Sequence, residues 1–364
     1  MAWIFTQFMP GFEPPLLARG SKKTSGAKES PAAADAAAVY FLAEEAFEQI
    51  YGPEDRATIS SRVKTSGQLI TPQDYRDSST TWPGVEMIFS GWGMVPMDEV
   101  FFQRFPKLKV VFYAAGTVKG FVTDAFWRRN IRLTNAAAAN AVPVSEFTIS
   151  QILFALKHGW QQAFYIRKHG KYPPCDVPPG AYRTTVGLIS LGAIGSLVAE
   201  MLRQFDMRVV AYDPFFPPEE AAKLNVTLLP LEEVFAVSDV VSCHTPVLSN
   251  TERMIRGRHF ESMKAGATFI NTARGAIVDE EEMIAALKKR PDLFAILDVT
   301  EPMPPAGGSP LYVLENVVLT PHIAGSLGAE CGRMGRLMVE EMDRFLAGKP
   351  LSYEIDEARF QTMA

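Results

Sequence analysis

The stretch from Thr185 to Asp213 constrains the fold of this 364-residue chain more than any other part of it. It begins with a nearly continuous apolar run, Val186–Leu191, which is typical of a strand covered on both faces. Apolar residues then recur at helical spacing from Ile194 to Phe205, so the strand is expected to turn sharply into an amphipathic helix. A second strand, Arg208–Tyr212, leads to an acidic residue, Asp213. The order strand, turn, helix, strand and acid is typical of a dinucleotide-binding unit.

The turn itself holds small residues that predict a pyrophosphate site. Gly192, Ala193, Ile194 and Gly195 would let backbone amides approach the phosphates at the positive end of the helix. In the usual pattern G-x-G-x-x-G the first position is a third glycine, but here it is Ser190. If this serine must take a positive φ, we expect strain of about 1–3 kcal/mol and weaker cofactor binding.

Asp213 lies 18 residues after the last of these glycines, where an acid is expected to meet the adenosine ribose hydroxyls. A carboxylate there would repel a 2′-phosphate, and the next residues, Pro214, Phe215 and Phe216, include no arginine to neutralise one. The sequence therefore predicts NAD as the cofactor in preference to NADP.

Length and composition set the wider frame. A chain of 364 residues exceeds one ordinary core, so about two domains are expected. No run approaches the ~18 apolar residues of a membrane span, and a net charge of −5 without a basic stripe gives nucleic acid little to bind. Cys175, Cys243 and Cys331 are too few and too far apart for a disulfide frame or a zinc site. Without a basic leader at the start of the sequence, we expect a cytoplasmic protein with no metal.

The rest of the chain predicts an α/β fold of two doubly wound Rossmann-like domains with a cleft between them. Before Pro83 we expect a strand at Trp3–Phe8, an insertion over Leu16–Ala38, a helix at Ala37–Tyr51 and little else. Strands are then expected at Val85–Ser90 and Leu108–Tyr113, with a helix at Met97–Phe105 between them. A long helix should start at Asn140 with Pro143 in its first turn and lead into a polar crossing, His158–Pro179.

The second half continues the alternation of strand and helix. Five further strands are expected at Val226–Leu229, Val240–Cys243, Ala267–Ile270, Ala295–Asp298 and Val317–Thr320, separated by helices at Leu231–Val237, Arg258–Met263 and Asp279–Leu287. A last helix, Gly328–Ala347, is expected to return to the first domain. We therefore predict a flavodoxin-like substrate domain over 1–141 plus 328–364 and a dinucleotide-binding domain over 142–327.

Four ordered segments resemble the D-isomer-specific 2-hydroxyacid dehydrogenases. They are SDVVSCHTP (238–246), INTARGAIVDEEEM (270–283), ILDVTEP (296–302) and LTPHIAG (319–325), and the resemblance extends over about 86–348. It implies that Arg274 binds the substrate carboxylate and carbonyl, which a planar guanidinium can do through paired bonds. It also implies that His322 is the acid/base, since a group that gives and takes the carbonyl proton should titrate near neutrality. Taken alone, each would more often be an ordinary surface or packing residue.

The resemblance implies further roles. Gly116, Thr117 and Val118 would bind the substrate carboxylate through backbone amides, and Trp92 would wall the pocket, although a structural tryptophan fits this position equally well. Asp298 would hold the nicotinamide carboxamide. The remaining cofactor-binding residues would be His244, which is not expected to be catalytic, with Thr245, Pro246, Thr251, Thr272 and Ala273. The family also implies a homodimer formed around the nucleotide domain.

One position departs from the family. A glutamate is usual five residues after the aspartate of the DV motif, where it bonds the catalytic histidine, but this chain has Met303. Glu301 stands two positions earlier and is not assigned that role. Because a carboxylate favours the imidazolium, we expect reduction to fade at lower pH here than in relatives with the glutamate.

The function predicted from the sequence is hydride transfer between NAD(H) and a small 2-oxo acid or D-2-hydroxy acid. An alternative from another class is an NAD(H)-sensing binding protein without turnover, because fold does not fix function. Ser190 and Met303 favour that alternative, whereas Arg274 and His322 favour the enzyme. A formate-type dehydrogenase is a weaker third reading, since no feature of the first domain supports it.

Overall fold

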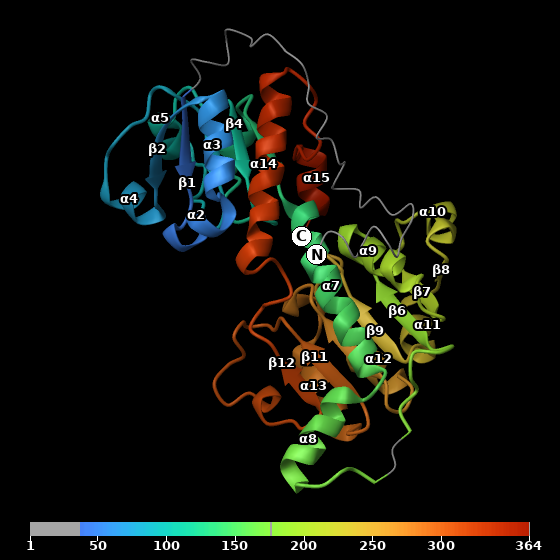
Figure 1. Ribbon diagram of the computed structural model, residues 1–364. Coiled ribbons are helices and arrows are strands. Elements are labelled where there is room, and N and C mark those ends of the chain that lie inside the picture. Colours follow the sequence, from blue (N-terminus) through green and yellow to red (C-terminus); the bar gives the residue numbers. More distant parts are fainter. Residues whose placement is uncertain (1–36, 175–176, 364) are drawn as a thin grey trace. The chain divides into compact units, whose positions relative to one another are not determined.

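The computed structural model describes residues 37–174 and 177–363, which divide into two compact units (Figure 1). The first unit holds the described residues up to Ala139 together with Gly332–Ile355, and the second holds the rest, Asn140–Cys331 and the residues from Asp356 onward. Compared with the expected domains, this grouping moves 140–141, 328–331 and 356–363 into the second unit. The strand expected at Trp3–Phe8 and the expected insertion, apart from its last two residues, lie outside the described residues.

The first unit is built on five parallel strands in the order β2-β1-β3-β4-β5. These strands are β1 (Ala37–Phe41), β2 (Lys64–Ile70), β3 (Val85–Ser90), β4 (Val110–Tyr113) and β5 (Arg132–Asn135). The helices that connect or cover them are α2 (Glu44–Ile50), α3 (Pro53–Arg62), α4 (Pro72–Asp77), α5 (Glu99–Arg104), α6 (Asp124–Trp127) and α14 (Cys331–Leu346). The carboxyl ends of all five strands therefore meet at one edge of the sheet.

The helix expected at Ala37–Tyr51 is wrong. Its first part is strand β1, an interior strand of the sheet between β2 and β3, and only α2 is helical. A central strand of a parallel sheet is buried on both faces, so it lacks the alternation that marks a strand, and its alanines suggested a helix. The polar stretch before Pro83, expected to hold little regular structure, likewise contains α3, β2 and α4.

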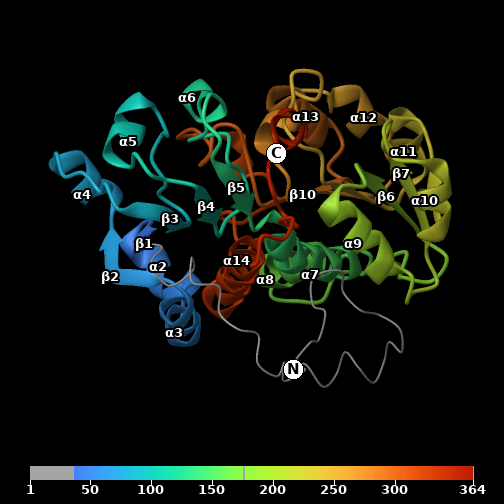
Figure 2. The same ribbon diagram turned by 90° about the horizontal axis from the view of Figure 1, so that it is seen from above.

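Adjacent aromatic residues on β1 serve opposite faces of this sheet. The Tyr40 ring lies 5.0 Å from that of Phe47 in α2, and the Phe41 ring lies 6.1 Å from that of Phe101 in α5. Figure 2 shows the two sets of helices on either side of the strands. Because side chains alternate along a strand, these two neighbouring residues pack against helices on opposite faces of the sheet.

The C-terminal part completes this unit, as expected for the last helix. Arg132 at the start of β5 donates two hydrogen bonds to the Glu354 carboxylate, at 2.8 and 2.6 Å. Glu341 of α14 is buried and accepts the backbone N–H groups of Ser352 and Tyr353, both at 3.1 Å. These contacts fix residues 350–355 against the edge strand.

The second unit is built on seven parallel strands in the order β12-β11-β10-β9-β6-β7-β8. They are β6 (Thr185–Ile189), β7 (Arg208–Tyr212), β8 (Val226–Leu228), β9 (Val240–Cys243), β10 (Thr268–Asn271), β11 (Phe294–Leu297) and β12 (Val317–Leu319). The chain order reverses between β6 and β9. In open α/β sheets, that switch point is where ligands bind.

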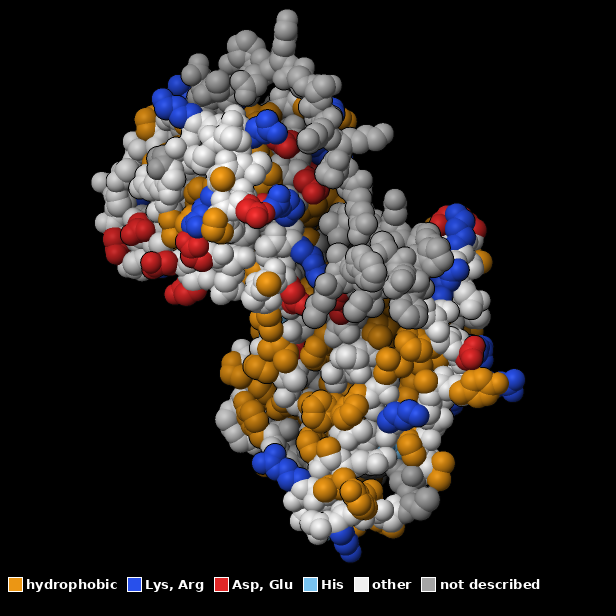
Figure 3. Space-filling model, in the orientation of Figure 1, with side chains coloured by type: hydrophobic (Ala, Val, Ile, Leu, Met, Phe, Trp, Pro, Cys, Tyr) orange, Lys and Arg blue, Asp and Glu red, His pale blue; other side chains and the backbone are white. Residues whose placement is uncertain are grey.

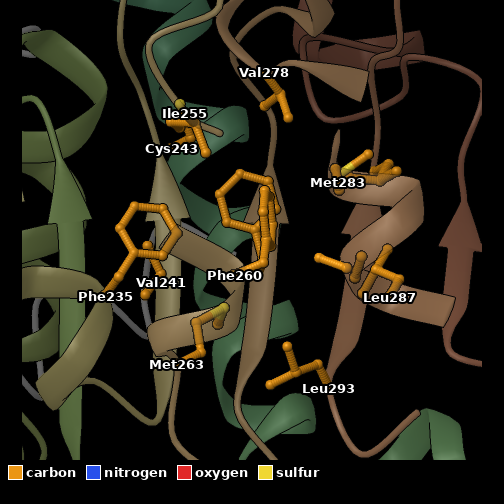
Figure 4. Close-up of a cluster of buried hydrophobic side chains, with 14 of the residues drawn as sticks. Phe235, Val241, Cys243, Ile255, Phe260, Met263, Val278, Met283, Leu287 and Leu293 are labelled. Atoms are coloured by element: carbon orange, nitrogen blue, oxygen red, sulfur yellow. The ribbon is translucent and has the colours of Figure 1, made fainter. Parts of the chain in front are cut away.

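Helices cover both faces of this sheet (Figures 1 and 2). They are α7 (Ala137–Ala155), α8 (Gly159–His169), α9 (Ala193–Leu202), α10 (Pro218–Lys223), α11 (Leu231–Val237), α12 (Gly257–Ser262) and α13 (Glu280–Lys289). The unit also contains the helix α15 (Glu357–Thr362) and the short 3-10 turns η1 (Gly275–Ile277), η2 (Pro310–Tyr312) and η3 (Gly328–Glu330). On β10, Phe269 packs into the core with α11, α12 and α13, shown in Figure 4, and Ile270 into the core with α7 and α9.

The strands expected in the second half of the chain are all present, with bounds that differ by at most two residues. Two expectations about its helices are wrong. Helix α7 begins at Ala137, so Pro143 lies inside the helix and not in its first turn, and the expected polar crossing His158–Pro179 contains α8.

Within the described ranges, no single helix has the length and apolar character needed to cross a membrane, and α7 and α8 meet that test only jointly, across a 61° bend.

Candidate active site

The turn after β6 carries the strain that the sequence predicted for it. Ser190 has a φ of 75°, in the left-handed region that costs a residue with a side chain about 1–2 kcal/mol. Its backbone N–H donates to the carbonyl of Tyr212 at 2.8 Å, and its hydroxyl lies 3.0 Å from that of Thr245. The hydrogen bonds of the serine offset part of the strain.

The two glycines of the turn meet different requirements. A Cβ atom on Gly195 would lie 2.1 Å from the carbonyl oxygen of Ser190, so no side chain fits there. Among the described residues, a Cβ atom on Gly192 would meet nothing within 4 Å, and no side chain caps the helix α9 that begins at Ala193. The amides of the first helical turn, which include those of Ala193 and Ile194, therefore have no side-chain acceptor in the described part of the chain and can bind an anion.

Asp213, after β7, is held by backbone amides. One carboxylate oxygen accepts the N–H of Leu191 at 2.8 Å, and the other accepts those of Phe215 and Phe216 at 2.9 and 3.1 Å. The carboxylate therefore joins the glycine turn to the end of β7. Since a carboxylate has about four acceptor positions, it retains capacity for one ribose hydroxyl.

The segment after β9 brings a buried histidine beside the turn. His244 is 8 % exposed, and neither ring nitrogen has a hydrogen-bond partner among the described residues. Burial lowers its pKa to about 3, so the ring is neutral at neutral pH. A Cβ on Gly195 would lie 3.7 Å from this ring. Further on, the Thr251 hydroxyl donates to the carbonyl of Pro246 at 2.6 Å and so closes the loop.

At the end of β10, a buried asparagine orders the loop that carries Arg274. The Asn271 side chain accepts the N–H of Ala273 and donates to the carbonyl of Arg274, both at 3.0 Å. The hydroxyl of Thr272 lies 3.4 Å from that of Thr148 in α7. The loop is thereby fixed on both sides.

Arg274 itself is half-buried without an acidic partner. Its guanidinium donates to the carbonyl of Ala273 at 2.6 Å, and burial lowers its pKa from the ordinary value. Within the described part of the chain, no carboxylate lies within ion-pair distance of it. A partly desolvated cation is usually compensated by an anion, so this group is suited to a ligand carboxylate.

Gly275 lacks a side chain, which allows the loop after β11 to approach the loop after β10 closely. A Cβ on it would lie 2.1 Å from the carbonyl carbon of Thr300 and 2.5 Å from the backbone nitrogen of Glu301. Neither backbone atom can move out of the way cheaply. The loops after β10 and β11 are thus in direct backbone contact.

The loop that carries His322 is fixed by Asp298. This carboxylate is buried, with one oxygen accepting the Thr320 hydroxyl at 2.6 Å and the N–H of Ile323 at 2.8 Å. The other oxygen accepts the N–H of Ala324 at 2.9 Å. Between these contacts His322 has a φ of 57°, and its side chain is exposed. These contacts make Asp298 the anchor of the histidine loop, and the contact with the nicotinamide that the resemblance implies stays a prediction.

Backbone hydrogen bonds connect the three loops in sequence across the sheet. The Asp298 N–H donates to the carbonyl of Asn271 at 3.0 Å, and the His322 N–H donates to the carbonyl of Asp298 at 3.1 Å. Because β10, β11 and β12 are neighbours, Arg274 and His322 start from the same edge, two strands and about 10 Å apart. This is a suitable separation for two side chains that act on one small molecule.

Neither of the two residues near the DV motif that were considered as partners of His322 bonds to it. Met303 is 55 % exposed, and Glu301, also exposed, donates its N–H to the carboxylate of Glu280 at 3.1 Å. No described contact joins either side chain to His322.

In the first unit, the loop after β4 is ordered at the carboxyl edge of the sheet. Asn135 donates to the carbonyl of Gly116 at 2.8 Å, and the Thr117 hydroxyl accepts the N–H of Lys119 at 3.4 Å. Gly116 and Thr117 are partly exposed, while Val118 is buried. Trp92, after the neighbouring strand β3, is 39 % exposed.

Three residues that organise this site were not predicted from the sequence. Asn271 and Thr320 hold the arginine and histidine loops, and Asn140 of α7 accepts the N–H of Ser326 at 2.8 Å. Asn271 and Thr320 stand directly at strand ends, where side chains that bond nearby backbone are common, and this signal could have identified them. No local pattern announces Asn140, whose partner is 186 positions away.

A parallel sheet with an uncapped glycine turn at its switch point, and an unpaired guanidinium and an imidazole at the same edge, defines a dinucleotide-binding protein of the dehydrogenase class. The model of the D-isomer specific 2-hydroxyacid dehydrogenase, NAD binding domain, matches residues 150–324. The glyoxylate reductase of Korarchaeum cryptofilum is 32 % identical over 70 % of this chain and 78 % of its own length. This chain belongs to the D-isomer-specific 2-hydroxyacid dehydrogenase family, and its second unit contains the family's NAD-binding domain.

Other relatives are longer. The D-3-phosphoglycerate dehydrogenase of Archaeoglobus fulgidus is 34 % identical over 70 % of this chain, but the match spans 48 % of that protein, about half its length. The NAD complex of the D-isomer specific 2-hydroxyacid dehydrogenase from Lactobacillus delbrueckii ssp. bulgaricus has a TM-score of 0.73, with 24 % identity, covering 88 % of this chain and 100 % of that one. The two-unit α/β fold expected from the sequence is confirmed by this likeness.

Proposed function

We propose that this protein transfers a hydride between NAD(H) and a small 2-oxo acid or D-2-hydroxy acid. The observation that carries this proposal is the half-buried guanidinium of Arg274, which has no carboxylate partner in the described structure and shares a sheet edge with His322. A protein that only senses NAD(H) has no use for an unpaired cation held in this way. The alternative of a binding protein is therefore not favoured.

The residues present fit the cofactor. The uncapped amides that follow Gly192 would hold the pyrophosphate, Asp213 the adenosine ribose, and the open space over Gly192 would admit the phosphates. The buried ring of His244, without a partner, would receive a polar group of the bound nucleotide. When bound, NADH supplies the hydride for the carbonyl carbon of the substrate.

The side chains at the strand ends would supply the remaining chemistry. Arg274 would grip the substrate carboxylate and polarise its carbonyl, which places the carbonyl carbon for attack. His322, as the imidazolium, would give its proton to the carbonyl oxygen, and it would take that proton back in the oxidative direction. Asp298 would act indirectly by holding the loop on both sides of His322.

We also propose that two copies of the chain associate through the second unit. Helix α8 has no buried residue, and Phe164 and Ile166 on it are 37 % and 38 % exposed. Phe154 of α7 and Tyr172 add to this surface, and Figure 3 shows hydrophobic side chains gathered over these helices. An apolar surface of this kind is typical of an interface between subunits. Sedimentation equilibrium of the wild type and of Phe164→Glu should give a dimer and a monomer, respectively.

The hydride transfer is tested by following NADH absorbance with a panel of 2-oxo acids. Arg274→Gln should lower kcat/KM by at least about 100-fold, the loss expected when a paired charge-assisted contact to the carboxylate disappears. The affinity for NADH, measured by fluorescence titration, should stay within about threefold of the wild type. The proposal is refuted if no 2-oxo acid is reduced, or if Arg274→Gln weakens NADH binding and turnover equally.

A further inference from the structure

A pocket of about 440 Å³ opens at the amino ends of β6 and β7, in the second unit. Its walls are formed by Tyr182, Arg183, Asp206, Met207 and Arg208. Two backbone hydrogen bonds hold these walls together: the N–H of Arg183 donates to the carbonyl of Asp206 at 2.7 Å, and the N–H of Arg208 donates to that of Thr184 at 2.8 Å. Sites for small molecules have volumes of about 300–1,000 Å³, so this pocket is large enough for one.

The pocket lies at the opposite end of β6 from the glycine turn. The turn follows Ile189 at the carboxyl end of this strand, whereas the pocket precedes Thr185 at its amino end. Five residues of a strand span about 17 Å, so a ligand in the pocket would not touch the cofactor turn. The pocket is therefore a separate site, which neither cofactor binding nor hydride transfer uses.

Three charged side chains line the pocket, and none of them is paired. Arg183, Asp206 and Arg208 are exposed, and within the ranges that the structure describes their side chains form no ion pair and no hydrogen bond. Arg203, three residues before Asp206, does pair with an acid, Glu200, at 2.9 Å. Two free guanidinium groups are suited to a phosphate, which they bind through paired charge-assisted bonds. A free carboxylate is suited to hydroxyl groups, which donate to it.

The backbone of Arg183 is strained. Its φ is 59°, in the left-handed region that a residue with a Cβ atom adopts only at a cost, whereas glycine adopts it freely. Strain of this kind is found mainly at functional sites. The guanidinium carbon of Arg183 lies over the ring of Tyr182, 5.0 Å from its centroid, and this cation–π contact orients the charge. An arginine at a position that favours glycine indicates that the side chain has a use there.

The apolar part of the pocket consists of one exposed ring and one buried side chain. Tyr182 is 64 % exposed, so most of its surface is open to a ligand, while Met207 is buried and forms the floor. An exposed aromatic ring offers a stacking surface for another ring, such as a nucleobase. The pocket therefore combines groups for a phosphate, for hydroxyls and for an aromatic ring.

We propose that this pocket binds a nucleoside monophosphate. The guanidinium groups of Arg183 and Arg208 would hold the phosphate, the Asp206 carboxylate would accept the ribose hydroxyls, and the base would stack on Tyr182. The proposal does not depend on the hydride transfer and adds a second nucleotide site to the NAD site. A nucleic acid is not the expected ligand, because a polymer is bound through many phosphate contacts and the pocket has two cations.

The test is isothermal titration calorimetry of adenosine 5′-monophosphate into the full chain at saturating NADH. NADH occupies the cofactor turn, so heat from the monophosphate reports a second site. We expect one equivalent to bind. Adenosine, which lacks the phosphate, and inorganic phosphate, which lacks the base, should each bind at least about tenfold more weakly, since each loses one set of contacts.

Variants assign the binding to the pocket. Arg183→Gln and Arg208→Gln should each raise the Kd of the monophosphate at least about tenfold, the loss expected for charge-assisted bonds to phosphate. Tyr182→Ala should raise it about tenfold, through lost stacking. Arg203→Gln, which breaks a pair outside the pocket, should leave it within about twofold.

Arg183→Gly separates the use of the side chain from its cost. It should bind the monophosphate as weakly as Arg183→Gln, yet unfold at a higher urea concentration than Arg183→Gln, because glycine relieves the strained φ. If Arg183→Gln fails to fold, Arg208→Gln and Arg183→Gly still decide the question.

Three outcomes would overturn the proposal. They are a wild type that binds no monophosphate beside NADH, inorganic phosphate that binds as tightly as the monophosphate, and Arg183→Gln and Arg208→Gln variants with the wild-type Kd. None of these measurements involves turnover, so their failure would leave the proposed hydride transfer standing.

Discussion

Asp298→Asn tests whether this carboxylate orders the histidine loop or binds the cofactor. In the wild type, three donors on either side of His322 converge on the two oxygens, from Thr320, Ile323 and Ala324. Asparagine has nearly the same shape, but it removes the charge and replaces one acceptor by an N–H donor. Hydrogen bonds to charged groups contribute about 1.5–3 kcal/mol each, so losing one and weakening the others should cost the loop about 2–4 kcal/mol.

The cost should fall on turnover. If the productive position of His322 depends on this loop, about 2–4 kcal/mol corresponds to a reductive kcat lowered about 30- to 1,000-fold. NADH affinity, measured separately by fluorescence titration, should change by less than about threefold. Asp292→Asn is a matched control, since Asp292 lies on the surface of the same unit and pairs with Arg290. The reasoning would be refuted by an Asp298→Asn variant that keeps the wild-type kcat and instead loses NADH affinity by about 30- to 1,000-fold.

Three further predictions concern other residues of the second unit. Ser190→Ala keeps the left-handed backbone without the hydroxyl, so in urea it should be less stable than Ser190→Gly by about 1 kcal/mol; equal midpoints would contradict the strain. The pKa of His244 is lowered to about 3, so the unfolded chain takes up a proton below about pH 6.5 that the folded chain refuses. From pH 7 to pH 5 the free energy of unfolding should therefore fall by about 2 kcal/mol more in the wild type than in His244→Asn, and parallel curves for the two would refute this. Met303→Glu should move the alkaline limb of reductive kcat/KM to higher pH by about one unit, the size expected for a pairing with the imidazolium worth about 1.4 kcal/mol; an unmoved limb would discard the idea.

The second unit could be predicted from the sequence because its strands are short apolar runs separated by clear turn signals. The same signals placed Arg274, Asp298 and His322 at the ends of three strands, and the sheet order then makes those strands neighbours. The positive φ of Ser190 also followed from its place in the glycine pattern. What local sequence could not supply is the pattern of hydrogen bonds that hold the loops, which joins groups far apart in the chain, such as the Asn140 side chain and the backbone N–H of Ser326.

The first unit was predicted less well, for a physical reason. Strand β1 lies inside the sheet and is buried on both faces, so it shows no alternation, and its alanines favour a helix as strongly as a strand. The case of Asp298 shows another limit of the sequence. The contact with the nicotinamide that the resemblance implies stays a prediction, whereas only the coordinates reveal that the two oxygens of this carboxylate accept three hydrogen bonds from the histidine loop.

The left-handed backbone of His322 decides how an inert version of this protein should be made. Alanine or glutamine would remove the imidazole, but both tolerate a positive φ poorly. A loss of turnover in these variants could therefore reflect a displaced loop. Asparagine tolerates this conformation better than most residues with a side chain, and glycine tolerates it freely. His322→Asn is therefore the substitution of choice for trapping a complex with both ligands in place, because it silences the proton transfer while the surrounding chain keeps its path.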